Sequence, residues 1–235
     1  MDKQTQKKLL ETVKKNYQST AHEFSDSRKK KNRSWDGLLG IAKSVKNNSS
    51  ILDVGCGNGR LLEIIKNKEI NYLGTDSCQE LLELAKKYHP AKEFKQVDIL
   101  DLSKTPQINF DYVFCVAVLH HLPGDDLRVA AMKQLKNKIS DNGEIIISVW
   151  NLWSQKKFRK LIWKFFILKI LGKNKMDFGD ILFDWKNPEG EAVSQRYYQA
   201  FSKRSLKKIA RSAGLKIKSF KKDEYNYYLI LEKKS

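Results

Sequence analysis

The chain has 235 residues, of which 41% are hydrophobic, and its formal net charge is +18. This length and apolar content suit one α/β domain with an insertion, and they exclude a wholly disordered chain. The excess of Lys and Arg favours a polyanionic partner, nucleic acid above all or an anionic membrane surface, whereas lysines that only cover solvated faces would need no partner.

The pattern before residue 50 predicts two helices separated by a basic loop. Residues 5–17 are predicted as a helix, residues 25–35 ("SDSRKKKNRSW") as a polar loop, and residues 35–46 as a second helix. Strands and helices then alternate up to residue 150. The expected strands are 51–54, 72–75, 94–97, 112–118 and 144–150, and helices are expected to begin at Leu61, Gln79 and Asp126.

The chain beyond residue 150 departs from this alternation. Residues 158–171 form an apolar run that four cations interrupt, so we expect no stable insertion into a membrane. A cap helix whose apolar face closes over a pocket is the favoured interpretation, and a basic amphipathic helix on a membrane surface is the alternative. A helix at 205–212 is expected to follow, and then a hairpin of strands 215–220 and 225–232.

These elements predict an α/β, Rossmann-like fold, with a mostly parallel sheet, helices on both faces and a C-terminal antiparallel hairpin strand. We expect residues 1–235 to form a single domain. Residues 1–47 would be a helical cap with a basic loop, residues 48–150 and 202–235 the core, and residues 151–201 an insertion that caps the site.

Cysteine positions and the N-terminal charge indicate the compartment. Cys56, Cys78 and Cys115 lie beside or within apolar stretches, and none of them forms a C-x-x-C pair. We therefore predict no disulfide framework and no metal site. Residues 1–15 are too charged for a secretory signal, so a cytoplasmic protein is expected.

A glycine-rich loop follows the first expected strand in the stretch "ILDVGCGNGR", residues 51–60. In an open α/β sheet this loop lies at the carboxyl end of the strand, where ligands bind. Gly55 and Gly57 permit a tight turn, and Gly59 permits close packing of the next helix. The spacing differs from the dinucleotide form G-x-G-x-x-G, and Asp53 would repel a phosphate but attract an ammonium group. The motif therefore points away from NAD.

Two further acids follow the next two expected strands. Asp76 ends "YLGTD", about 20 residues beyond the glycines, where an acid hydrogen-bonds ribose hydroxyls. Asp98 in "QVDIL" can accept a hydrogen bond from an adenine amine, with Ile99 beside the ring. A single acid there is more often a turn or N-cap residue, but three in register with the glycine loop indicate a cofactor site. Adenosine joined to a cationic amino-acid group describes S-adenosylmethionine.

Five segments of the chain together resemble the successive motifs of class I S-adenosylmethionine-dependent methyltransferases: "ILDVGCGNGRLL", "YLGTDSCQELLELAKK", "QVDILDL", "FDYVFCVAVLHHL" and "GEIIISVW". The resemblance implies a seven-stranded sheet. The site residues that it implies are Asp53, Gly55, Gly57 and Gly59 around the methionine part, Asp76 with Ser77 at the ribose, Asp98 and Ile99 at the adenine, and Ala117 and Val118 at the sulfonium end.

A narrower resemblance lies outside this core. The segments "YQSTAHEFSDSRKKKNRSW", "GDILFDWK" and "RYYQAFSKRSLKKIARSAG" are similar to the tRNA wobble-uridine carboxymethyl methyltransferases. That family methylates the carboxylate of 5-carboxymethyluridine in the anticodon loop, which gives an ester. The chain departs from the family pattern at Asp184, where a proline is usual, and at Gln199, where a histidine is common.

The chemistry that this second resemblance implies needs alignment more than proton transfer. A carboxylate is ionised at neutral pH and attacks a methyl group without a general base, so the enzyme has only to hold it in line. The candidates for this task are Arg28, Arg196, His121 and Tyr197. Arg28 could instead pair with the methionine carboxylate of the cofactor. His120 and His121 could exchange roles, and Tyr197 could be an ordinary packing residue.

The expected partner is tRNA, bound through its anticodon loop. The basic segments 28–33, 154–160 and 202–208 would contact stem phosphates while a flipped wobble base enters the pocket. Eukaryotic members of the family require a small activator subunit, so the resemblance adds such a subunit to the candidate partners. The main alternative is a small-molecule methyltransferase for a quinone precursor or lipid-like acceptor, with residues 162–171 as an apolar lid. A cofactor-binding subunit without catalysis is a third class, which the intact glycine loop and acids disfavour.

Overall fold

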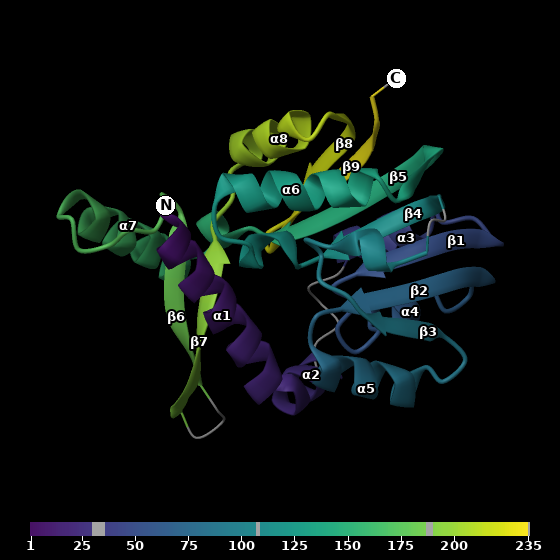
Figure 1. Ribbon diagram of the computed structural model, residues 1–235, viewed down its shortest axis with the longest axis horizontal. Helices are drawn as coiled ribbons and strands as arrows, with labels where there is room; N and C mark the ends of the chain where they lie inside the picture. The colour runs from purple at the N-terminus through teal and green to yellow at the C-terminus, as the bar shows by residue number, and fades with distance from the viewer. Residues whose placement is uncertain (30–35, 107–108, 187–189, 235) are drawn as a thin grey trace.

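The structure is a computed structural model that describes residues 1–29, 36–106, 109–186 and 190–234, with the backbone alone at 27–29, 36 and 186. A seven-stranded sheet forms its core, and helices lie against both faces of that sheet (Figure 1). A second, two-stranded sheet stands apart from the core, at the end where the N-terminus lies.

The large sheet has the strand order β3-β2-β1-β4-β5-β9-β8. The first five of these strands are parallel neighbours, and β9 joins antiparallel to β5 and to β8. The predicted seven-stranded fold with a C-terminal antiparallel hairpin is therefore confirmed. The strands are β1 (Ser49–Val54), β2 (Ile70–Asp76), β3 (Glu93–Gln96), β4 (Phe110–Val116), β5 (Ile139–Trp150), β8 (Leu215–Lys222) and β9 (Asn226–Lys233).

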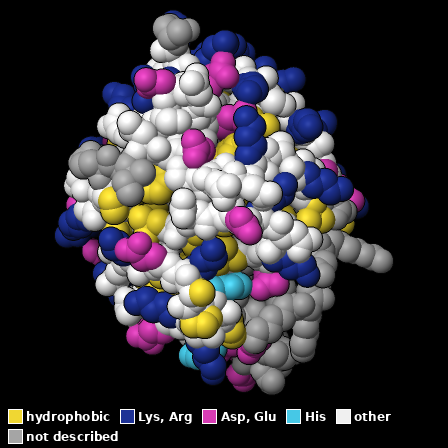
Figure 2. All heavy atoms as spheres, turned by 90° about the vertical axis from the view of Figure 1, so that its right-hand side faces the viewer, with side chains coloured by type: hydrophobic (Ala, Val, Ile, Leu, Met, Phe, Trp, Pro, Cys, Tyr) yellow, Lys and Arg dark blue, Asp and Glu magenta, His cyan; other side chains and the backbone are white. Residues whose placement is uncertain are grey.

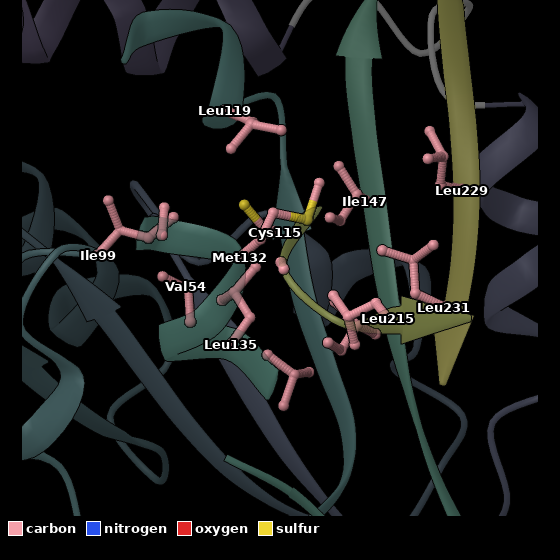
Figure 3. Close-up of a cluster of buried hydrophobic side chains, with 14 of the residues drawn as sticks. Val54, Ile99, Cys115, Leu119, Met132, Leu135, Ile147, Leu215, Leu229 and Leu231 are labelled. Carbon is pink, nitrogen blue, oxygen red and sulfur yellow. The ribbon is translucent and has the colours of Figure 1, made fainter. Parts of the chain in front are cut away.

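Each face of the sheet carries its own hydrophobic core. On one face α6 (Asp125–Lys136) and α8 (Lys203–Ser212) contribute Met132 and Leu206 to a cluster with the sheet residues, part of which Figure 3 shows. On the other face α3 (Asp36–Ala42), α4 (Leu61–Ile64) and α5 (Gln79–Tyr88) pack on the sheet. Because both faces are covered, the central strands are continuous apolar runs rather than alternating ones.

The insertion contains a hairpin that the sequence analysis assigned no structure. Strands β6 (Asp180–Lys186) and β7 (Ala192–Gln199) form the second sheet, and α7 (Lys156–Ile170) packs on one of its faces. Helix α1 (Lys3–Ser19) lies between this hairpin and the large sheet (Figure 1). The N-terminal helix and the insertion therefore stand together over the carboxyl end of the parallel strands.

Three local expectations are corrected. The basic segment predicted as a loop from residue 25 is helical up to Lys29, within α2 (Ala21–Lys29), and its remainder at 30–35 lies outside the described residues. Strand β4 ends at Val116, because Ala117 adopts a left-handed φ of 60°. The apolar run at 158–171 is a helix, but it covers the cavity only at its first turn.

Helix α7 exposes much of its apolar surface. Trp163, Ile167 and Ile170 are 51%, 54% and 69% exposed, whereas Phe158 and Ile162 are buried. Among the described residues, no helix combines the length and the low polarity that a membrane span requires.

Candidate active site

A cavity of about 830 Å³ opens at the carboxyl end of the parallel strands. Ligands of open α/β sheets bind at this edge, and the volume lies in the range of about 300–1,000 Å³ typical of ligand clefts. Helix α1 forms one wall through Leu10, Val13 and Tyr17. Nine of the ten residues predicted to bind the cofactor line the cavity: Asp53, Gly55, Gly57, Asp76, Ser77, Asp98, Ile99, Ala117 and Val118.

The glycine loop needs glycine for different reasons at each position. Gly55, Gly57 and Gly59 all have left-handed φ angles, of 72°, 56° and 79°. A Cβ at Gly55 would overlap Val118, and a Cβ at Gly59 would lie 2.8 Å from the His89 ring. Gly57 meets no atom closer than 3.9 Å, so the space beside it is the cavity itself. Gly59 does not line the cavity, so its predicted place around the methionine part is corrected; the space beside it is filled by the rings of His89 and Phe94.

Asp53 is a buried carboxyl group at the cavity wall. It is 2% exposed, and the Tyr72 hydroxyl donates to its Oδ2 at 2.8 Å. Burial raises the pKa of Asp53 to about 7, although the Tyr72 bond opposes the rise. Such a group gains from a cation beside it, because the cation offsets the cost of keeping the charge out of water. The position therefore fits the ammonium group that the sequence analysis predicted beside Asp53.

Asp76 holds the glycine loop in place as well as lining the cavity. Its Oδ2 accepts from the Gly57 backbone N–H and its Oδ1 from that of Cys78, both at 2.9 Å. Burial raises the pKa of Asp76, and these backbone bonds oppose the rise. Each carboxylate oxygen retains a second lone pair, so hydroxyl groups of a ribose can still donate to it.

The adenine end and the sulfonium end of the predicted site lie on opposite sides of this loop. Asp98 is exposed at the end of β3, where its Oδ1 accepts from the Leu100 N–H at 2.8 Å, and the buried Ile99 follows it. Ala117 follows β4, and its N–H donates to the Ser148 carbonyl at 2.9 Å. A non-glycine residue in the left-handed region stores strain, which is frequent beside functional sites.

His121 is the one predicted catalytic residue that lines the cavity among those whose side chains are described. Its Nδ1 lies 3.3 Å from the Tyr197 carbonyl and its Nε2 lies 2.7 Å from the Tyr17 hydroxyl. The carbonyl only accepts, so Nδ1 carries a proton, and in the neutral form of the ring Nε2 accepts from the Tyr17 hydroxyl. His121 thus orients the Tyr17 hydroxyl at the cavity wall.

His120 has a structural position. It is 1% exposed, and its Nδ1 accepts a long 3.4 Å hydrogen bond from the Trp150 backbone N–H. His121, and not His120, therefore lines the cavity. Both rings pack tilted against Tyr198, which is itself buried.

Tyr197 does not contact the cavity, and the expectation that it holds the acceptor is corrected. Its hydroxyl lies 2.7 Å from Oδ1 of Asp180, to which it donates, and accepts from Arg128 at 3.0 Å. Arg128 also contacts Asp180 at 3.4 Å and Asp125 at 3.0 Å. This buried network fastens the β6–β7 hairpin to α6, because strand alternation turns Tyr197 away from the face that carries Tyr198.

Of the two predicted arginines only Arg196 has a described side chain, and it does not line the cavity. Arg196 is 4% exposed, and its guanidinium lies over the Trp185 ring, 3.2 Å from the centroid. The prediction that Arg196 contacts the acceptor is therefore wrong, and Arg196 packs within the hairpin instead. The side chain of Arg28 lies outside the described residues, so its predicted role stays a prediction.

The positions that depart from the tRNA methyltransferase pattern also lie away from the cavity. Asp184 is exposed on β6. The Gln199 amide donates to the carbonyls of Phe178 and Ala200, both at 3.2 Å. Both departures therefore change the hairpin and leave the cavity wall unaltered.

Several residues of the cavity wall received no role in the sequence analysis. Tyr17 and Phe24 stood within a segment that carried a family resemblance but received no role. Trp150 ends β5, and a large aromatic residue at the carboxyl end of a parallel strand is itself a signal for a ligand contact. Among the cavity residues that received no role are Tyr17, Phe24, Trp150, Gln155, Phe158, Tyr225, Asn226 and Tyr228.

Comparison with known proteins agrees with this geometry. A family model described as "Methyltransferase domain" matches residues 10–219. The chain belongs to this methyltransferase family. The sequence-based recognition of a class I methyltransferase is confirmed by this match together with the fold.

Named relatives of this methyltransferase act on tRNA. The chain is 26% identical to the tRNA (carboxymethyluridine(34)-5-O)-methyltransferase of Schizosaccharomyces pombe over 235 residues, which cover 92% of this chain and 94% of that protein. It is 31% identical over 149 residues to the protein of the same name from Saccharomyces cerevisiae, covering 63% of this chain and 51% of the relative.

Solved structures share the fold of this methyltransferase. An SAM-dependent methyltransferase of Methanosarcina mazei superimposes with a TM-score of 0.68 at 20% identity, covering 82% of this chain and 96% of that one. The DhpI–SAM–HEP complex superimposes with a TM-score of 0.69 at 17% identity, covering 95% and 97%. At such identities the agreement concerns the fold.

Proposed function

We propose that this methyltransferase binds S-adenosylmethionine and transfers its methyl group to the carboxylate of a carboxymethyl-modified wobble uridine in tRNA. The observation that carries the proposal is the near full-length match to a tRNA carboxymethyluridine methyltransferase on a chain whose predicted acids and glycine loop line one cavity. Neither a family model nor a fold by itself names an acceptor.

The cavity residues fit this cofactor by their chemistry. Asp53 would bind the ammonium group, Asp76 the ribose hydroxyls, and Asp98 with Ile99 the adenine. The open space beside Gly57 leaves room for close approach of the methionine part. When bound, S-adenosylmethionine supplies an electrophilic methyl group.

The protein's own contribution to the reaction is alignment and the exclusion of water. An ionised carboxylate needs no base, so His121 is not required to take a proton. Its task is to fix the Tyr17 hydroxyl between the cofactor end and the acceptor end of the cavity. Correct placement of two reactants in a closed site accounts for several kcal/mol of barrier reduction.

The residues beside the cavity indicate a path for the RNA backbone. Basic side chains are spread over the face shown in Figure 2, between acidic ones, and do not gather there in one patch. Helix α7, by contrast, contains six cations and no acid, and its first turn reaches the cavity through Phe158. We assign the stem phosphates to the groove lined by Lys156, Arg159, Lys160 and Lys164.

The insertion, residues 151–201, then serves as the substrate cap. The competing interpretation, a small-molecule methyltransferase with an apolar lid, needs the apolar side of α7 to face the cavity. Phe158 alone on α7 does so, whereas Trp163 and Ile170 face away and are exposed. The geometry thus favours RNA over a lipid-like acceptor.

Location and partners follow from the proposed substrate. The cysteines at 56, 78 and 115 are free thiols in the described structure, as a reducing cytoplasm requires. We infer a cytoplasmic, tRNA-binding enzyme, for which a small activator subunit stays a prediction. Comparing transfer rates with and without such a subunit tests that prediction.

The acceptor is tested by the chemical stability of the product. Methyl-labelled S-adenosylmethionine is incubated with the protein and total tRNA or a lipid extract. Label in tRNA that brief mild alkali releases as methanol supports a carboxyl ester, because N- and C-methyl groups survive this treatment. Base-stable label, or label in the lipid extract alone, would overturn the proposal.

A further inference from the structure

The acceptor end of the cavity contains a group of residues to which neither the sequence motifs nor the family match assigns a role. We propose that Trp150 is the stacking platform for a uracil base and that the amides of Gln155 and Asn226 read its edge. This inference rests on the proposed function, since it names the residues that would hold the flipped base.

The platform is the end of a column of aromatic rings. Phe183 and Tyr198 are stacked with their centroids 5.2 Å apart and their planes 14° apart. Tyr198 and Trp150 continue the column at 5.0 Å and 16°. Phe183 and Tyr198 belong to the insertion hairpin, whereas Trp150 ends β5 and lines the cavity. The column therefore passes from the insertion into the site and stops at the cavity.

The column fixes the plane of the Trp150 ring. Tyr198 is 1% exposed and also packs on His120 and His121, with centroids at 4.8 and 4.7 Å. The Trp150 backbone N–H donates to His120, which anchors the end of β5 as well. A preorganised aromatic face loses little entropy when a base stacks on it, and every base offers such a face.

Two neutral amides line the cavity together with this ring. Asn226 is paired with Trp150 in the β5–β9 register, so the two side chains leave the sheet side by side. Gln155 precedes α7, and both Gln155 and Asn226 line the cavity. Uracil presents an acceptor, a donor and an acceptor along its edge. Amides supply both donors and acceptors, and they do so without a charge that would compete for the acceptor carboxylate.

The arrangement also explains why the cavity has two chemically different ends. The acids Asp53, Asp76 and Asp98 occupy the end that suits a cationic cofactor. The end around Trp150, Gln155 and Asn226 contributes aromatic and amide groups, which suit a neutral planar base. An anionic carboxymethyl group on that base would then lie between the ends, near Tyr17.

The test measures the contribution of the base separately from that of the RNA backbone. Two identical anticodon stem-loop RNAs are compared, one with 5-carboxymethyluridine at the wobble position and one abasic there. Calorimetry with S-adenosylhomocysteine present gives both dissociation constants. We expect the base to strengthen binding about tenfold in the original protein.

Trp150→Leu is expected to reduce the ratio of the two dissociation constants, abasic RNA over modified RNA, to about one. Trp150→Phe is expected to retain most of this ratio because a ring remains. Gln155→Glu should reduce the ratio severalfold, since a carboxylate cannot donate to uracil oxygens. Phe178→Leu is the matched control, because Phe178 is 48% exposed and lines neither the cavity nor the basic groove of α7, and it should leave the ratio unchanged.

The outcomes separate the two proposals. A full ratio in both Trp150→Leu and Gln155→Glu would overturn the platform even if base-labile label is found in tRNA. Equal dissociation constants of the original protein for the two RNAs would overturn the platform as well. Absence of methyl transfer to tRNA would overturn the proposed function. If Trp150→Leu fails to fold, as circular dichroism reveals, Gln155→Glu on the surface of the cavity mouth decides the result.

Discussion

The Tyr17 hydroxyl lies 2.7 Å from Nε2 of His121, although 104 residues separate them in the chain. This bond joins the N-terminal helix to the loop after β4, and both side chains line the cavity. Because His121 donates through Nδ1 to the Tyr197 carbonyl, the hairpin of the insertion also determines where Tyr17 stands. Three segments that are distant in sequence thus set one hydroxyl group at the site.

Removing this hydroxyl should slow transfer without preventing cofactor binding. One neutral hydrogen bond contributes about 1 kcal/mol, so Tyr17→Phe is expected to lower kcat/KM about fivefold. Steady-state rates with tRNA and calorimetry with S-adenosylhomocysteine measure the two effects separately. An unchanged kcat/KM would show that the hydroxyl has no part in alignment.

Gly55 should be indispensable for a reason that backbone strain alone does not provide. Gly55→Ala and Gly172→Ala both place a side chain at a left-handed φ, of 72° and 70°. Only the first would also overlap Val118, since a Cβ at Gly172 meets nothing within 4 Å. Gly172→Ala should lose about 1 kcal/mol of unfolding free energy, whereas Gly55→Ala should lose more because of the overlap and should also lose cofactor binding. Equal cofactor affinities in the two variants would contradict the placement of the glycine loop.

The stability of the ligand-free protein should depend on pH through Asp53. Its pKa is raised from 3.8 to about 7, so the folded protein holds this proton more tightly than the unfolded chain does. The associated stability is present below pH 4 and is lost as the pH rises through 7. Asp53→Asn should therefore raise the melting temperature of the ligand-free protein at pH 8.

The same substitution should weaken the cofactor. An ionised Asp53 attracts the ammonium group, so affinity in the original protein should fall as the pH drops below 7. Asp53→Asn is expected to bind at least about tenfold more weakly at pH 8, with a flatter pH profile. Calorimetric titrations at pH 6, 7 and 8 provide the measurement, and parallel profiles for both proteins would refute the assignment.

The buried ion pair between α6 and the hairpin should be sensitive to the loss of one partner. Arg128 and Asp180 have side chains that are 2% and 0% exposed. Arg128→Met leaves the Asp180 carboxyl, whose pKa is already raised to about 6 by burial, without its cation. We expect a loss of about 3–5 kcal/mol in urea unfolding. Asp125→Asn removes a partner that is 55% exposed and should cost less than about 1 kcal/mol.

RNA binding should weaken steeply with salt, and α7 should account for part of that dependence. Replacing Lys156, Lys160 and Lys164 by Gln should reduce the slope of log Kd against log salt by about 2–3. The matched control replaces three cations, Lys203, Arg204 and Lys207, on α8, which packs beside β8. Filter binding between low and physiological salt measures both slopes. A larger change in the control would move the RNA path to α8.

Local sequence determined the parallel core because its signals are local. The apolar strands, the glycines after β1 and the acids at Asp53, Asp76 and Asp98 follow one another at short spacings, and the rule that parallel strands share a carboxyl edge brings the acids together. The C-terminal antiparallel hairpin could be predicted from the sequence as well, since two strands joined by a short charged turn form a hairpin.

Tertiary structure alone decided which residues of the insertion face the site. In β7 a shift of one position exchanges the two faces of the strand, so Tyr197 enters the buried network with Asp180 while Tyr198 joins the aromatic column. Nothing within the segment "RYYQ" indicates which tyrosine does which. That choice depends on α1 packing against one face of the hairpin and α7 against the other, and both contacts join residues far apart in the chain.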